Sequence, residues 1–124
     1  MSFHILVIDD DEAIRISLSL LLQAKGYSVA LAKDGADGLS KYRERKPDLV
    51  ISDMIMPGHQ GIETIARIRA DDARLPIIAM SGSIQGGEGN FLDKAREAGA
   101  DHFLEKPFDA AQLLNLLSVV TKRA

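Results

Sequence analysis

Acidic, hydroxyl and basic side chains follow the apolar segments of this 124-residue chain, and their types point to phosphoryl chemistry. They are Asp9, Asp10, Asp53, Ser81 and Lys106. Most of the preceding segments are short and rich in β-branched residues, as strands buried on both faces should be. If these strands are parallel, their carboxyl ends share the sheet edge where open α/β folds bind ligands. The sequence therefore predicts three carboxylates, a hydroxyl and an ammonium group at one site.

Three neighbouring carboxylates repel one another, so such a site needs a cation or raised pKa values. Mg²⁺ suits it, because this hard cation prefers oxygen ligands and usually takes one or two carboxylates with waters and phosphate. An aspartate carboxylate can attack phosphorus and form an aspartyl-phosphate. A metal and a lysine can neutralise the charge on the transferred group. Together these residue types indicate phosphoryl transfer to a carboxylate.

Each of these residues also has an ordinary structural explanation. Asp53 can cap a turn, Ser81 can supply a turn hydroxyl, and Lys106 with Pro107 can form a turn after a strand. The acids at 9–11 can simply begin a helix. These alternatives do not explain why all of the residues meet at one sheet edge.

Strand and helix patterns alternate five times along the chain. Strands are expected at residues 5–8, 27–31, 49–52, 76–80 and 102–104. Helices are expected at residues 13–25, 36–45, 61–69 and 90–98, with a final helix capped by Asp109. Crossovers of this length make parallel, right-handed connections, with helices on both faces of the sheet. We predict a doubly wound α/β fold with a five-stranded parallel sheet and five helices.

Apolar residues at helical spacing predict which face of each helix is buried. The expected inner stripes are Ile14, Leu18, Leu21 and Leu22; Leu39 and Tyr42; Ile62, Ile65, Ala66 and Arg69; and Leu113, Leu116, Leu117 and Val120. Asp10 or Asp11 is expected to cap the first helix, and Gly26 is expected to follow its end.

Composition narrows the class of protein. The chain is 46% apolar and 27% charged with a net charge of -3, so we expect one globular domain over residues 1–124 and no nucleic acid contact. It has no cysteine, no apolar run of membrane-spanning length and no basic signal region, so we expect a cytoplasmic protein without membrane contact. The three histidines share no metal-ligand spacing, and we assign them no role.

Four ordered segments resemble the receiver domain of bacterial two-component response regulators. They are I-L-V-I-D-D-D (5–11), D-L-V-I-S-D-M-I-M-P-G (48–58), P-I-I-A-M-S-G (76–82) and G-A-D-H-F-L-E-K-P-F (99–108). The resemblance covers nearly the whole chain and implies a single-domain receiver of flavodoxin-like fold, with strand order 2-1-3-4-5.

The resemblance also implies a role for each residue of the site. Asp53 would accept a phosphoryl group from a sensor histidine kinase or a histidine phosphotransfer protein. Asp9 and Asp10 would hold Mg²⁺ together with Asp53 and the backbone carbonyl of Ile55. Lys106 would pair with the phosphate, and a cis peptide bond would precede Pro107.

Further positions implied by the resemblance concern signalling. Ser81 would be the switch hydroxyl, in place of the more usual threonine, and Phe103 the switch aromatic, without the hydroxyl of the frequent tyrosine. Ile55 and Ser83 would flank the path of the hydrolytic water and tune dephosphorylation. The loop at 84–90 is longer and richer in glycine than in many receivers.

Three functions are compatible with these residues. The first is a phosphorylation-dependent signalling switch that turns over no separate substrate and signals to an output protein through its fourth helix, fifth strand and fifth helix. The second is a small phosphatase or phosphotransferase with an aspartate nucleophile. Met54 and Ile55 argue against it, because such enzymes usually need a second acid near the nucleophile. The third is a degenerate receiver that binds partners without phosphorylation, which the intact acids and lysine argue against.

Overall fold

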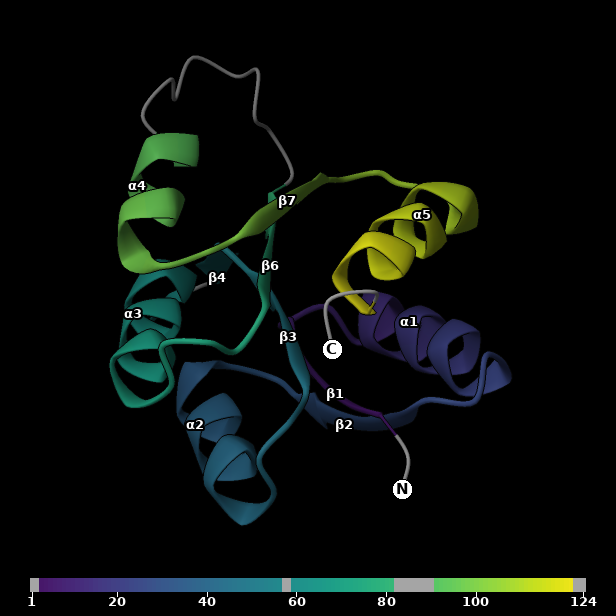
Figure 1. Cartoon of the computed structure of the whole chain (residues 1–124), viewed down its shortest axis with the longest axis horizontal. Helices are drawn as coiled ribbons and strands as arrows, with labels where there is room; N and C mark the ends of the chain where they lie inside the picture. The colour runs from purple at the N-terminus through teal and green to yellow at the C-terminus, as the bar shows by residue number, and fades with distance from the viewer. Residues whose placement is uncertain (1–2, 57–58, 82–90, 122–124) are drawn as a thin grey trace.

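Within the described residues, five parallel strands form a central sheet that helices cover on both faces (Figure 1). The computed structural model describes residues 3–56, 59–81 and 91–121. The sheet order is β2-β1-β3-β6-β7, made of β1 (His4–Ile8), β2 (Ser28–Ala32), β3 (Leu49–Asp53), β6 (Ile77–Ser81) and β7 (His102–Glu105). This confirms the doubly wound α/β fold and the expected order 2-1-3-4-5, with β6 and β7 as the fourth and fifth strands.

The helices divide between the two faces of the sheet. α1 (Glu12–Ala24) and α5 (Ala110–Thr121) lie on one face, to the right in Figure 1. α2 (Gly35–Glu44), α3 (Gly61–Asp71) and α4 (Phe91–Ala98) lie on the other. α1, α2 and α3 each pack against the strand before them, as right-handed crossovers between parallel strands require.

Two apolar cores hold these layers together. Alternate residues of each strand point to opposite faces, so continuous apolar strands supply both cores. One core joins the sheet to α2, α3 and α4, and its fully buried members include Ile8, Val50, Ile65, Ile68 and Ile77. The other joins the sheet to α1 and α5, and its members include Ile5, Val7, Leu22, Ile51 and Leu113.

Local sequence signals set the ends of the first two helices. Asp11 is the N-cap of α1, and its carboxylate accepts hydrogen bonds from the backbone N–H groups of Ala13 and Ile14. Gly26 follows the α1 C-cap with φ of +92°, a left-handed conformation that glycine adopts without strain. Asp34 caps α2 by accepting from the N–H of Asp37.

The predicted inner face of the third helix is wrong at Ala66. This residue is exposed, and the buried face of α3 is instead formed by Gly61, Thr64, Ile65 and Ile68. Burying Ile68 removes far more apolar area from water than burying Ala66, which decides the rotation of the helix. The other predicted elements differ from the structure by one or two residues at their ends.

A two-stranded antiparallel sheet follows β3 and was not predicted. Its strands are β4 (Ile55–Met56) and β5 (His59–Gln60), which pair Ile55 with Gln60. Strands of two residues are too short to show a periodic pattern in sequence. None of the helices in the described part of the chain has the length and apolar character needed to cross a membrane.

Candidate functional site

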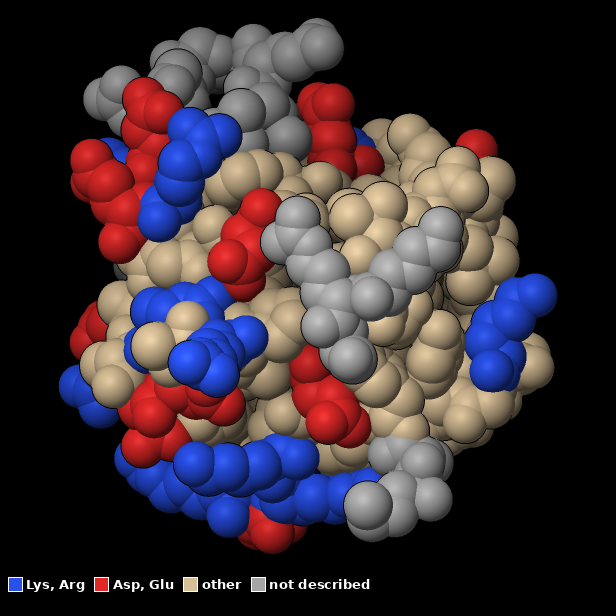
Figure 2. Space-filling view, viewed as in Figure 1, with Lys and Arg blue, Asp and Glu red and all other residues tan. Residues whose placement is uncertain are grey.

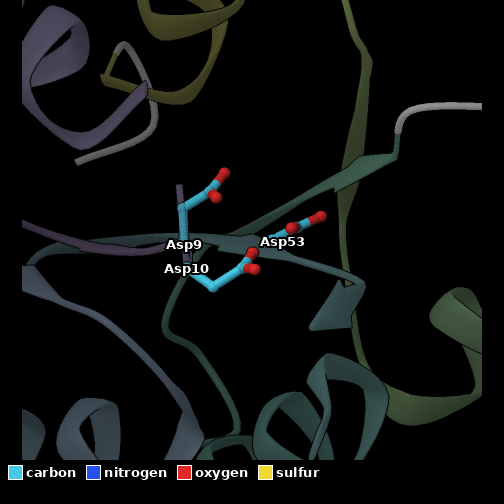
Figure 3. A group of neighbouring side chains, drawn as sticks. All are labelled: Asp9, Asp10 and Asp53. Atoms are coloured by element: carbon cyan, nitrogen blue, oxygen red, sulfur yellow. The ribbon is translucent and has the colours of Figure 1, made fainter. Parts of the chain in front are cut away.

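Three aspartates meet at the carboxyl edge of the sheet (Figure 3). Asp53 is the last residue of β3, and Asp9 and Asp10 directly follow β1. Each offers a carboxylate oxygen, and these oxygens lie within 4.8 Å of one another. Figure 3 shows the three side chains emerging from the neighbouring ends of the two strands. The structure therefore brings together the acids that the sequence predicted at one site.

The register of the sheet explains this meeting. β1 and β3 are parallel neighbours that pair Ile8 with Ser52. The next residue on each strand is Asp9 and Asp53, so continuing the register by one step places the two acids side by side. Asp9 is completely buried and Asp53 is 6% exposed, whereas Asp10 is exposed to solvent.

Lys106 lies between the two buried acids. Its Nζ donates a hydrogen bond to Asp9 Oδ2 at 2.9 Å and forms an ion pair with Asp53 Oδ2 at 3.3 Å. Its backbone N–H donates to the carbonyl of Ser81 at 2.7 Å, which fixes the residue beside the end of β6. The Lys106–Pro107 peptide bond is cis.

The surroundings of Lys106 keep it charged. Burial lowers its pKa, but the hydrogen bond to Asp9 and the charge of Asp53 outweigh burial, so the net effect is a raised pKa. The backbone around Asp9 is also held in place: its carboxylate accepts from the N–H of Asp11, and its carbonyl accepts from Arg15 Nη1 at 2.7 Å. Arg15 was not singled out from sequence, because an arginine on a predicted amphipathic helix is usually a solvated residue.

Ser81 and Phe103 lie near this site on the next two strands. Ser81 ends β6 and is 5% exposed, one residue beyond Met80, which pairs with Asp53. Phe103 on β7 is partly buried against the core shared with α4, and the guanidinium carbon of Arg96 lies 5.4 Å from its ring centroid. The ring therefore packs against α4 and the core beside it.

The remaining predicted positions are only partly covered. The backbone of Ile55 belongs to β4, directly after the residue that follows Asp53. Ser83 and the loop at 84–90 lie outside the described residues.

Gly61 also contributes to the site, although its sequence pattern predicted only the start of the third helix. Its N–H donates to the carbonyl of Met54, and a Cβ at this position would overlap the backbone carbonyl of Asp53. Only glycine lets α3 begin this close to Asp53.

The donor set fits a hard divalent cation. All ligand atoms of the cluster are carboxylate oxygens, with no histidine or cysteine among them. Such oxygen sites suit Mg²⁺ and Ca²⁺, and a site with few carboxylates and solvent access on one side suits Mg²⁺ best. Asp10 is exposed, so the cluster is open to solvent on the side of this residue.

Comparison with known protein families identifies the domain that carries this site. Residues 5–118 match the model of the response regulator receiver domain. The chain belongs to this family. The family generally acts as phosphorylation-dependent signalling switches and generally uses Mg²⁺.

Full-length relatives of this receiver are response regulators. The chain is 37% identical over 123 residues to the response regulator MprA of Mycobacterium tuberculosis, covering 99% of the chain and 52% of MprA. It is 34% identical over 120 residues to the transcriptional regulatory protein CseB of Streptomyces coelicolor, covering 97% of the chain and 50% of CseB. The receiver thus spans about half the length of the curated relatives it matches.

Solved receivers superpose closely on this one. The chemotaxis protein CheY4 of Vibrio cholerae aligns with a TM-score of 0.88 at 30% identity, covering 97% of this chain and 99% of CheY4. A CheY-like receiver from Methanospirillum hungatei aligns with a TM-score of 0.90 at 25% identity, with both chains fully covered.

Proposed function

We propose that Asp53 of this receiver is the phosphoacceptor and that its phosphorylation switches the domain between two signalling states. The observation that carries this is the position of Lys106 between Asp9 and Asp53, 2.9 Å from one carboxylate and 3.3 Å from the other. The lysine supplies a fixed positive charge where a phosphoryl group on Asp53 would add negative charge. A lysine is suited to this as a compact point charge.

The proposed donor is a phosphohistidine on a sensor histidine kinase or a histidine phosphotransfer protein. A carboxylate oxygen of Asp53 forms a bond to phosphorus, and the phosphorus–nitrogen bond of the donor breaks. The imidazole leaves with the electron pair, and the phosphoryl group remains on Asp53 as a mixed anhydride.

Asp9, Asp10, Asp53 and the backbone carbonyl of Ile55 are the proposed Mg²⁺ ligands. Bound Mg²⁺ would neutralise charge on the transferred phosphoryl oxygens. The protein residues do the rest: Asp9 is buried and held by the N–H of Asp11 and by Lys106, so its carboxylate is oriented in advance. The chemistry then ends with the domain's own phospho-aspartate, without turnover of a separate substrate.

The proposed signal is a change on the surface formed by α4, β7 and α5. A phosphoryl group on Asp53 would offer the Ser81 hydroxyl a new acceptor, and Phe103 would respond to its movement, which is a local charge event biasing a two-state element. A related solved structure, the DrrB receiver domain, is described as BeF3-activated and aligns with a TM-score of 0.85 at 28% identity. The proposed reader of this surface is an output protein.

The test is phosphorylation by a small phosphodonor such as acetyl phosphate, followed by intact mass. We expect a single phosphoryl addition that requires Mg²⁺, is abolished by a chelator and is absent in Asp53→Ala. Lys106→Met should accept the group much more slowly. Phosphorylation of Asp53→Ala to the wild-type extent would refute the assignment, and turnover of a generic phosphate ester would favour a phosphatase instead.

A further inference from the structure

An open groove lies between α2 and α3. Its volume is about 550 Å³, and the residues that line it include Leu39, Tyr42, Arg43, Lys46, Arg67 and Asp71. Most of these residues lie in or just after the C-terminal halves of the two helices. Because the helices run antiparallel to the strands, the groove lies toward the sheet edge opposite Asp53. We call it the α2–α3 groove.

Tyr42 forms a fixed part of the wall of the α2–α3 groove. This residue is only 4% exposed and belongs to the core, and its hydroxyl donates a hydrogen bond of 2.6 Å to Asp71 Oδ2. This bond ties α2 to α3 across the groove. Leu39 extends the apolar wall along α2. Lys46 Nζ lies over the Tyr42 ring, 5.7 Å from its centroid, so a ligand would meet Lys46 and Leu39 rather than the open face of the tyrosine.

The groove has an excess of positive charge. Three cations line it against one carboxylate, and that carboxylate is already engaged: Asp71 accepts from Tyr42 and pairs with Lys46 at 3.3 Å. The hydrogen bonds from Tyr42 and Lys46 hold the pKa of Asp71 below its usual value. Figure 2 shows Lys and Arg side chains as a band along the lower edge of the view, around α2.

Two guanidinium groups of the groove are available to a ligand. Arg43 is exposed and, within the described part of the chain, makes no salt bridge or side-chain hydrogen bond. Arg67 lies 3.7 Å from Glu63, but both side chains are more than 60% exposed, and such a pair contributes little. By contrast, Lys41 and Arg45 of the same segment are used internally, on the carbonyl of Leu31 and the hydroxyl of Ser28.

We propose that the α2–α3 groove docks a short acidic peptide segment of a partner protein. Carboxylates of the segment would pair with Arg43 and Arg67, since guanidinium groups bind carboxylates in bidentate geometry. An aliphatic side chain between them would pack on the partly exposed Leu39. The whole chain carries a net charge of -3, so an acidic partner is repelled elsewhere and steered to this local positive surface. An open groove encloses too little of a small ligand to hold it well, which favours an extended peptide.

The position of the groove makes this docking independent of phosphorylation. Asp53 lies at the opposite edge of the sheet, and no residue of the α2–α3 groove belongs to α4, β7 or α5. The bound partner would stay in place in both signalling states. This inference does not depend on the proposed role of Asp53.

The test is a titration of the isotope-labelled chain with an end-blocked Glu-Glu-Leu-Glu-Glu-Leu-Glu peptide, followed by amide shifts. We expect saturable shifts confined to residues 39–46 and 67–71, with a Kd on the order of 100 µM that weakens with salt. The pair Arg43→Gln with Arg67→Gln should bind about tenfold more weakly, equivalent to ~1.4 kcal/mol. Phosphodonor and Mg²⁺ should leave the Kd unchanged.

The matched control is Lys25→Gln with Lys94→Gln. This pair removes the same charge from two exposed positions, Lys25 at the end of α1 and Lys94 on α4. All four substituted side chains are exposed, so both pairs should keep the wild-type spectrum and thermal stability. Equal weakening by the two pairs would reduce the effect to net charge and overturn the proposal. Shifts outside the groove, no saturable binding, or tighter binding of ATP at the same residues would overturn it as well.

Discussion

A Cβ atom at Gly61 would overlap the backbone carbonyl oxygen of Asp53, so the start of α3 and the central acid of the site are in direct backbone contact. The N–H of Gly61 also donates to the carbonyl of Met54 at 2.9 Å, which closes the turn between them. Any side chain at position 61 must push α3 away from the end of β3. The geometry of Asp53 therefore depends on a residue that carries no functional group.

We expect Gly61→Ala to destabilise the domain by about 1–3 kcal/mol through overpacking. It should also slow phosphorylation of Asp53, because the carboxylate moves relative to Lys106. The measurements are urea unfolding and the rate of phosphoryl uptake from a small phosphodonor. The control is Ala66→Gly on the exposed face of α3, which costs about 1 kcal/mol by helix propensity without touching Asp53. If both variants take up phosphate at the same rate, the contact does not position the site.

Asp10→Asn should weaken Mg²⁺ binding about tenfold, equivalent to ~1.4 kcal/mol. The fold should survive, because removing the charge of one of three clustered carboxylates reduces the repulsion between them. Mg²⁺ titration followed by amide shifts measures the affinity. Asp11→Asn is the matched control: it removes the same charge one residue away, and asparagine still caps α1. Equal affinities for wild type and Asp10→Asn would count against a metal role.

Lys106→Met should lower the free energy of unfolding by about 3 kcal/mol without Mg²⁺, because the buried Asp9 loses its hydrogen-bonded cation. Without the competing charge of Lys106, the acids of this variant should bind Mg²⁺ more tightly. Excess Mg²⁺ should therefore raise the free energy of unfolding more in the variant than in wild type, since a ligand stabilises the folded state more when it binds more tightly. Unfolding curves with Mg²⁺ and with chelator give both numbers. If Mg²⁺ stabilises the variant no more than it stabilises wild type, Lys106 does not influence the metal site.

His4 should make stability depend on pH. Burial, followed by the charge of Arg45, lowers its pKa below 6.5 in the folded state, and its Nδ1 lies 2.9 Å from Ser28 Oγ. The unfolded chain therefore takes up the proton first as pH falls. The stability contributed by neutral His4 is fully present above pH 6.5 and is lost as pH falls toward the folded-state pKa.

The loss amounts to about 1.4 kcal/mol for each pH unit between the two pKa values. Unfolding of wild type and His4→Gln at a series of pH values from 7.5 downward measures it, and imidazole shifts report the folded pKa directly. We expect the variant to lack this step. An imidazole of His4 that titrates at or above 6.5 would remove the basis of the prediction.

Much of the fold and the acid cluster could be predicted because the strands carry their information locally. Residues 5–8 and 49–51 are continuous apolar runs, as strands buried on both faces should be, and each is followed closely by an acid. The strand order that the family resemblance implies makes β1 and β3 neighbours, and their parallel pairing then brings Asp9 beside Asp53.

Features that depend on tertiary contacts were missed. The buried face of α3 was misjudged because Ala66 looks apolar in sequence but costs little to expose. Arg69 was predicted on an inner face, but its partners are distant in the sequence and could not be predicted from neighbouring residues. It donates to the carbonyl of Gly99 and pairs with Asp101 at 2.7 Å, which joins α3 to the turn before β7. The Gly61 contact has no sequence signal beyond the glycine itself.

Phosphorylated Asp53 should be long-lived. Hydrolysis needs a water in line with phosphorus, and a side chain that holds this water speeds the reaction. The position two residues after Asp53 is Ile55, which is apolar and branched, and the position two after Ser81 is Ser83, which is short. Neither is a long amide or acid able to orient water, so we expect slow dephosphorylation, suited to sustained signalling.

Ile55→Asn should speed the loss of the phosphoryl group by about tenfold if water positioning contributes ~1.4 kcal/mol to the barrier. The measurement is the decay of phosphorylated Asp53 after the phosphodonor is removed. Ile55→Val is the control, because it keeps an apolar, branched side chain and should decay at the wild-type rate. Ile55 would not limit hydrolysis if the asparagine variant decayed no faster than wild type, and the slow rate would then have to come from elsewhere in the site.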